Sequence, residues 1–90
     1  MEVEIKRNGQ KIELSMPIPK TKVYNAAEVW EANGYVHVDP QDIENYKEIK
    51  WKGIEFNRLV SKGGKLYRFN GWVGLYPYAR IEIEEIGNIH

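Results

Sequence analysis

Hydrophobic and polar positions alternate one by one over most of the first sixteen residues. The apolar positions of this pattern are Val3, Ile5, Ile12, Leu14 and Met16. Residues that alternate in this way form strands with one buried face. Between the two runs stands Asn8-Gly9, a dipeptide that favours a two-residue type I′ turn. We therefore predict an antiparallel hairpin over residues 1–16, with Ile5 opposite Ile12 and the apolar side chains buried together.

Residues 25–34 have the composition and the end signals of a short helix. Asn25 is a favourable N-cap, and Glu28 stands three residues later at the capping-box spacing. Gly34 supplies a left-handed stop after the last helical residue. The apolar positions on one face are Ala26, Val29 and Trp30. We expect this face to pack on a sheet, with Trp30 as a principal core residue.

After the helix, the pattern returns to short strands divided by glycine and proline. Tyr35–Val38 predicts a strand, and Asp39-Pro40-Gln41-Asp42 has the cap and the proline that open a helical turn ending near Tyr46. Further strands are predicted over Ile54–Val60, Leu66–Phe69, Trp72–Tyr76 and Tyr78–Ile86. Gly63-Gly64 and Asn70-Gly71 are both turn sequences, so we expect a hairpin at each.

These elements predict an α+β fold in a single domain over residues 1–90, built mainly from antiparallel hairpins with one short packed helix. The hairpin-then-helix order of residues 1–34 resembles the opening of β-grasp folds such as ubiquitin. A small curled barrel is the alternative shape for residues 48–86. We give the β-grasp resemblance no weight in assigning a function.

Composition narrows the setting of the domain. The chain has no cysteine, so neither a disulfide nor a cysteine-held zinc can support the fold. No apolar run approaches the length of a membrane span, and the first residues lack the features of a signal peptide. We expect a soluble, cytoplasmic protein with no cofactor and no membrane partner.

Charge is balanced overall but unevenly distributed. Residues 25–46 carry five acidic residues and no lysine or arginine: Glu28, Glu31, Asp39, Asp42 and Glu44. Residues 47–80 carry eight basic residues and only two acids. Such asymmetry is typical of two solvated surfaces, and it also occurs on binding faces.

Catalytic chemistry finds little support in the residues present. Ser15 and Ser61 lie in strand-like sequence without a glycine-flanked elbow, and His37 stands alone in a strand. Asp39 and Asp42 are accounted for by the start of a helical turn, and Glu44 by solvent, so we expect no metal site there. We expect no enzyme, and a small metal-dependent activity is the last alternative.

The segment 47–80 interleaves aromatic rings with cations and is the candidate binding region. If Asn70-Gly71 is a turn, four aromatic side chains share one face: Tyr67, Phe69, Trp72 and Tyr76. That face is either core or an exposed platform on which single-stranded bases could stack. The cations beside it would contact phosphates: Arg58, Lys62, Lys65 and Arg68.

The sequence therefore favours a non-catalytic binding or accessory domain that acts through a protein partner. A single-stranded nucleic-acid-binding module using residues 47–80 is the alternative. Homo-oligomerisation stays open.

Overall fold

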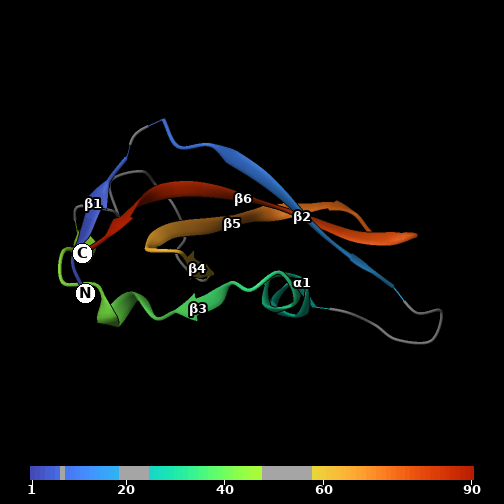
Figure 1. Ribbon diagram of the computed structural model, residues 1–90, viewed down its shortest axis with the longest axis horizontal. Coiled ribbons are helices and arrows are strands. Elements are labelled where there is room, and N and C mark those ends of the chain that lie inside the picture. Colours follow the sequence, from blue (N-terminus) through green and yellow to red (C-terminus); the bar gives the residue numbers. More distant parts are fainter. Residues whose placement is uncertain (7, 19–24, 48–57) are drawn as a thin grey trace.

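The computed structural model describes residues 1–6, 8–18, 25–47 and 58–90 (Figure 1). Its elements are β1 (Val3–Ile5), β2 (Lys11–Pro17), α1 (Ala26–Ala32), β3 (Val36–Val38), the 3-10 helix η1 (Pro40–Asp42), β4 (Leu59–Lys62), β5 (Lys65–Gly74) and β6 (Tyr78–Ile89). The six strands form one antiparallel sheet in the order β1-β6-β5-β4-β3, and β2 also pairs with β6. The α+β class expected from the sequence is confirmed.

The longest strand, β6, pairs with β5 along one edge and with both β1 and β2 along the other. Val3 lies opposite Ile89, and Ile12 lies opposite Ile83. The predicted hairpin over residues 1–16 is therefore wrong, because Ile5 and Ile12 both face β6 instead of each other. Each strand was predicted correctly, but the partner of each strand was not.

The Asn8-Gly9 dipeptide does not form a tight turn but lies where two backbone segments come close together. Neither residue has a positive φ, so the type I′ turn is absent. A Cβ added at Gly9 would collide with the backbone carbonyl of Glu85 in β6. Glycine is thus required because two backbones meet there. The edge of β6 is long enough to pair with β1 and β2 in succession. If β1 and β2 had paired with each other instead, part of this edge would have stayed unpaired.

The two later turn sequences have different outcomes. Gly63 and Gly64, with φ of 61° and 76°, join β4 to β5 in the predicted two-residue hairpin. The predicted turn at Asn70-Gly71 is wrong, because β5 runs straight through it. Its register against β6 shifts between Phe69 and Gly71, so this site is a β-bulge, with φ of 143° at Gly71. The chain reverses after Gly74 instead, before β6 begins.

The helix signals are confirmed in detail. The side chain of Asn25 accepts a hydrogen bond from the backbone N–H of Glu28 at 3.0 Å, and Gly34 has a φ of 84°. Ala26, Val29 and Trp30 are the buried residues of α1, as expected. The side chain of Asp39 accepts from the N–H of Gln41 and begins η1, in agreement with the predicted cap.

The described core has two parts. The first lies between α1 and the sheet, and its buried members are Leu14, Ala26, Val29, Trp30, Tyr35, Val60, Tyr67, Ala79, Ile81 and Ile83. The second lies at the other end of β6, and its buried members are Val3, Val38, Ile43, Leu59, Leu66 and Ile86. Val3 and Leu14, which we expected to share one cluster, therefore belong to different ones.

Two asparagine side chains tie β1 and β2 to the segments that follow η1 and α1. The side chain of Asn33, at the end of α1, donates to the carbonyl of Ser15 in β2 at 3.1 Å. The side chain of Asn45, after η1, bonds the backbone of Val3 in β1. The β-grasp opening is not formed, because β1 and β2 do not pair with each other. The architecture is closer to a curled sheet covered by α1 (Figure 1).

Of the predicted strand over Ile54–Val60, all but the last three positions lie outside the described residues, and β4 begins at Leu59. Among the described helices, none is long and apolar enough to cross a membrane.

Candidate functional site

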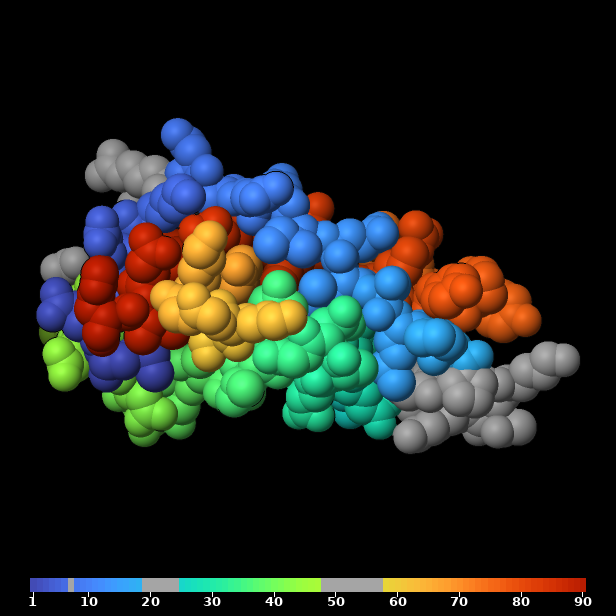
Figure 2. Space-filling model, viewed as in Figure 1, coloured from blue at the N-terminus to red at the C-terminus, as the bar shows by residue number. Residues whose placement is uncertain are grey.

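Large hydrophobic side chains are exposed where the β5–β6 hairpin ends. We call residues 72–78 the hairpin end. The exposed fractions are 40% for Trp72, 47% for Val73, 63% for Leu75, 74% for Tyr76 and 51% for Tyr78. Elsewhere in the described ranges, only Met1 and Val36 are large hydrophobics with comparable exposure. The hairpin end, in orange, protrudes from the body of the molecule in Figure 2.

The strands of the hairpin end extend beyond α1 and the described part of β4, while β2 accompanies β6 as far as Tyr78. The described part of β4 pairs with β5 only as far as Arg68, with one further hydrogen bond from the N–H of Phe69 to Arg58. Phe69 packs against Trp30 of α1. Beyond Phe69, β5 and β6 continue together to Gly74 opposite Arg80, past α1 (Figure 1).

The hairpin end is large enough to be an interaction site. Its five partly exposed side chains together present on the order of 500 Å² of surface, distributed over both faces of the hairpin, and the largest patch on a typical monomer is of comparable area and often functional. Scattered exposed residues need no explanation, but these five are neighbours in the chain. Burying them against a partner would release apolar surface from water, which is favourable.

Within the described ranges, little charge lies beside the hairpin end. Residues 71–79 contain no acidic residue and no lysine or arginine, and Arg80 is the next charged residue along the chain. The guanidinium of Arg80 lies against Gly74, where an added Cβ would come within 2.6 Å of it. It also pairs with Glu13 at 3.7 Å, and both side chains are about half exposed. As far as the described residues show, the site is an apolar surface with one arginine at its base.

The structure separates the four rings that the sequence placed on one face. Tyr67 is buried and packs edge-on against Tyr35, with 5.3 Å between ring centroids. Phe69 is half-buried against Trp30, at 5.9 Å. Trp72 and Tyr76 are exposed. Two rings are therefore core and two are surface, so the four-ring platform does not form.

Of the four side chains predicted to contact phosphates, three interact with other residues of the same chain. The Arg58 guanidinium lies over the rings of Trp30 and Phe69, at 5.9 and 5.3 Å from their centroids. Lys62 donates to the carbonyl of Asn33 at 2.8 Å and lies over the Tyr35 ring.

The other two cations lie on β5. Arg68 pairs with Glu84 at 3.1 Å, and Lys65 is exposed. Among the described residues, these four cations form no continuous row beside the hairpin end.

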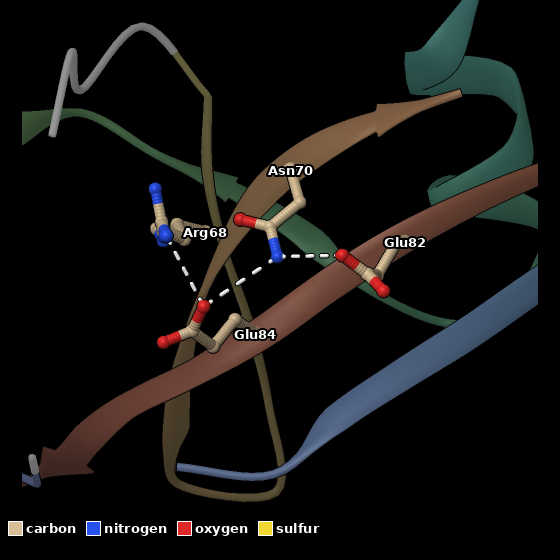
Figure 3. A network of polar contacts seen from close by, with 4 residues as sticks. All are labelled: Arg68, Asn70, Glu82 and Glu84. Carbon is tan, nitrogen blue, oxygen red and sulfur yellow. Dashed lines mark hydrogen bonds and ion pairs between the residues drawn. The ribbon is translucent and has the colours of Figure 1, made fainter. Parts of the chain in front are cut away.

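A polar network on β5 and β6 holds the bulge in place (Figure 3). The Asn70 side chain donates to Glu82 at 2.8 Å and to Glu84 at 3.5 Å, and Glu84 also accepts from Arg68 at 3.1 Å. Both carboxylates have donors in the chain itself. The network therefore accounts for the two glutamates as structural groups that fix the position of Asn70.

One buried polar group lies inside the sheet. Glu85 is buried and pairs with Lys6 at 3.5 Å. Burial raises the pKa of Tyr67 above its ordinary value, and the nearby Tyr35 and Glu85 raise it further. This arrangement keeps the Tyr67 phenol neutral in the core.

The remaining candidates for chemistry are separate. His37 is exposed on β3, and Asp39 caps η1. Within the described ranges, no group of three or more acidic or histidine side chains is placed to hold a metal ion.

Sequence reasoning did not assign Val73, Leu75 and Tyr78 to the candidate site. The available signal was the run Trp72-Val73-Gly74-Leu75-Tyr76-Pro77-Tyr78, in which both strand faces are apolar and no charge intervenes. A strand with two apolar faces is either buried on both sides or exposed on one, and only the fold decides. No family model, no curated protein and no solved structure matches this chain.

Proposed function

We propose that this protein is a non-catalytic, cytoplasmic binding domain whose hairpin end docks on another protein. The exposure of the five apolar side chains of residues 72–78 carries the proposal. Trp and Tyr are the residues most enriched among side chains that dominate protein interfaces. Trp72, Tyr76 and Tyr78 would be such anchors, and Leu75 would fill the space between them.

The chemistry of the hairpin end favours a protein partner over a nucleic acid. Nucleic-acid binding draws much of its affinity from cations that neutralise phosphates. Among the residues that the structure describes, Arg80 is the one cation placed beside the exposed rings, while Arg58, Lys62 and Arg68 are engaged within the chain. The aliphatic side chains of Val73 and Leu75 add apolar area without offering a ring on which a base can stack.

The shape of the hairpin end also constrains the partner. A protruding hairpin requires a concave apolar surface on the other protein. Stable interfaces bury about 800 Å² per partner, somewhat more than the roughly 500 Å² available here. The proposed interface is therefore at the small end of the range, which suits a reversible interaction.

A cross-linking experiment in cells of the source organism tests the proposal. A photoreactive amino acid replaces Tyr76, and the same substitution at Val36, which is also exposed, serves as the control. We expect a discrete protein adduct from position 76 that the Val36 probe does not form and that Leu75→Ser abolishes. Adducts that are identical at both positions, or that contain only nucleic acid, would overturn the proposal.

A further inference from the structure

The outer edge of β2 exposes backbone hydrogen-bonding groups in a defined pattern. Gln10 accepts from the N–H of Glu85, and the N–H of Ile18 donates to the carbonyl of Pro77. In an antiparallel pair these bonds fix the alternation, so that residues 12, 14 and 16 direct their peptide groups to β6. The N–H and C=O groups of Lys11 and Glu13 therefore point away from the sheet.

The open part of this edge is short. At one end, the carbonyl of Ser15 accepts from the side chain of Asn33, and Pro17 has no N–H to offer. At the other end, β2 begins at Lys11. The open stretch comprises four groups, the N–H and C=O of Lys11 and of Glu13, and continues to the N–H of Ser15. No described residue forms a hydrogen bond with any of the four.

We propose that the open edge of β2 pairs with the same edge of a second copy of this chain. The two β2 strands run antiparallel about a two-fold axis at Ile12. Lys11 then lies opposite Glu13 of the partner subunit, and Glu13 lies opposite the partner's Lys11. The N–H and C=O groups of Lys11 and Glu13 in the two copies then form four hydrogen bonds across the interface. The carbonyl of Ser15, which already accepts from Asn33, takes no part in this pairing.

Charge identifies the occupant as a second copy and fixes the register. Lys11 and Glu13 are both exposed on the same face of β2. Side chains directly opposite each other on paired strands interact, favourably when their charges differ and unfavourably when they match. Only the register centred on Ile12 sets lysine against glutamate twice. A shift by two residues sets Glu13 against Glu13 of the partner subunit, or Lys11 against the partner's Lys11.

The apolar side of the edge agrees with this register. Ile12 is partly buried and packs on the first core cluster. On the two-fold axis it faces the partner's Ile12, so the two clusters would become continuous. The pair of Glu13 with Arg80, at 3.7 Å and half exposed, is a weak competitor for the carboxylate.

Charged residues on an edge strand are also a common defence against unwanted pairing. The two explanations differ in their response to charge reversal. Glu13→Lys sets Lys11 against lysine, and Lys11→Glu sets Glu13 against glutamate. Under the proposal, each variant loses self-association but complements the other.

Sedimentation velocity at low salt, over concentrations up to millimolar, tests the pairing. We expect a concentration-dependent dimer for the wild type and a dissociation constant at least about tenfold higher for either single variant. An equimolar mixture of Glu13→Lys and Lys11→Glu should restore the dimer, as should the chain that carries both changes. Lys65→Glu, a charge reversal on an exposed residue of β5, is the matched control and should leave the dimer unchanged.

Two results would overturn the pairing. One is a wild type that stays monomeric throughout the concentration range. The other is a dimer that is insensitive to both charge reversals. A dimer lost only in Leu75→Ser would instead place self-association at the hairpin end. Circular dichroism of each variant separates loss of pairing from loss of folding.

Discussion

The side-chain amide of Asn45 hydrogen-bonds both backbone groups of Val3. It donates to the Val3 carbonyl at 2.6 Å and accepts from the Val3 N–H at 3.0 Å. A carboxamide carries the same donor and acceptor as a peptide group, so Asn45 takes the place of a neighbouring strand at the edge of β1. At Val3 this edge is covered by one side chain, whereas β2 has no equivalent partner for Lys11 and Glu13 among the described residues.

Asn45→Ala should therefore destabilise the fold. The change leaves the N–H and C=O of Val3, a buried residue, without the partners that Asn45 supplies. We expect a loss of about 1–3 kcal/mol in the free energy of unfolding, measured by urea denaturation. Asn8→Ala, at an exposed position, is the control and should stay within about 0.5 kcal/mol of the wild type. An equal effect of both changes would contradict the role of Asn45.

Trp30→Ala should remove a principal contact between α1 and the sheet. Trp30 is buried and packs edge-on against Phe69. We expect a cost of about 3–5 kcal/mol, a large part of the total stability of so small a domain. If the alanine variant does not fold, Trp30→Phe should fold with a smaller loss. A denaturation midpoint that does not move in either variant would show that this ring is not part of the core.

Gly9→Ala distinguishes a close backbone approach from a turn. The added Cβ would collide with the Glu85 carbonyl, so the two backbones must move apart. We expect a loss of at least about 3 kcal/mol. Gly64→Ala is the matched comparison: its φ of 76° strains an alanine, but the space around it is open, and we expect about 1–2 kcal/mol. Greater damage from Gly64→Ala would contradict the β1–β6–β2 arrangement.

The stability of the protein should fall at alkaline pH partly through Tyr67. Burial, together with Tyr35 and Glu85, raises the pKa of Tyr67 above its ordinary value of 10.0. Above this pH the unfolded chain loses the phenolic proton while the folded chain keeps it. The native state then binds more protons, so the free energy of unfolding decreases as pH rises. The stabilisation is fully present below pH 10.0 and is lost progressively above it.

Tyr67→Phe isolates this contribution from other groups that titrate at alkaline pH. The variant should show a shallower loss of stability above pH 10.0 than the wild type, with unfolding followed by far-ultraviolet circular dichroism. Tyr76→Phe, at an exposed tyrosine, should keep the slope of the wild type. Identical slopes in wild type and Tyr67→Phe would contradict the raised pKa.

Local signals in the sequence were reliable where one residue type suits only one geometry. Asn25 and Gly34 bounded α1, and Gly63-Gly64 formed its hairpin, because these positions need a cap or a positive φ. Asn8-Gly9 and Asn70-Gly71 were misinterpreted because glycine serves a close approach or a bulge as well as a turn. Pairing with β6 determines which of these roles each glycine has, and β6 lies more than 60 residues away from Asn8 in the chain.

The candidate site was only partly predictable for a related reason. Tyr67 and Trp72 lie on the same strand, and no local signal shows that α1 and Tyr35 cover the first but not the second. Arg58 and Lys62, predicted as phosphate contacts, lie over the core rings Trp30, Phe69 and Tyr35. Coverage of a strand depends on contacts that are distant in sequence, so exposure could not be predicted.

If the hairpin end is a binding surface, polar substitutions there should leave the fold intact. Leu75 and Tyr76 are exposed, so the double change Leu75→Ser and Tyr76→Ser should alter the free energy of unfolding by less than about 1 kcal/mol. Leu66→Ser, on the same strand system but fully buried, should cost several kcal/mol and serves as the positive control. Thermal and urea unfolding measure both. A double variant as damaged as Leu66→Ser would show that residues 72–78 are packed within the protein itself, and the proposed docking surface would be lost with that result.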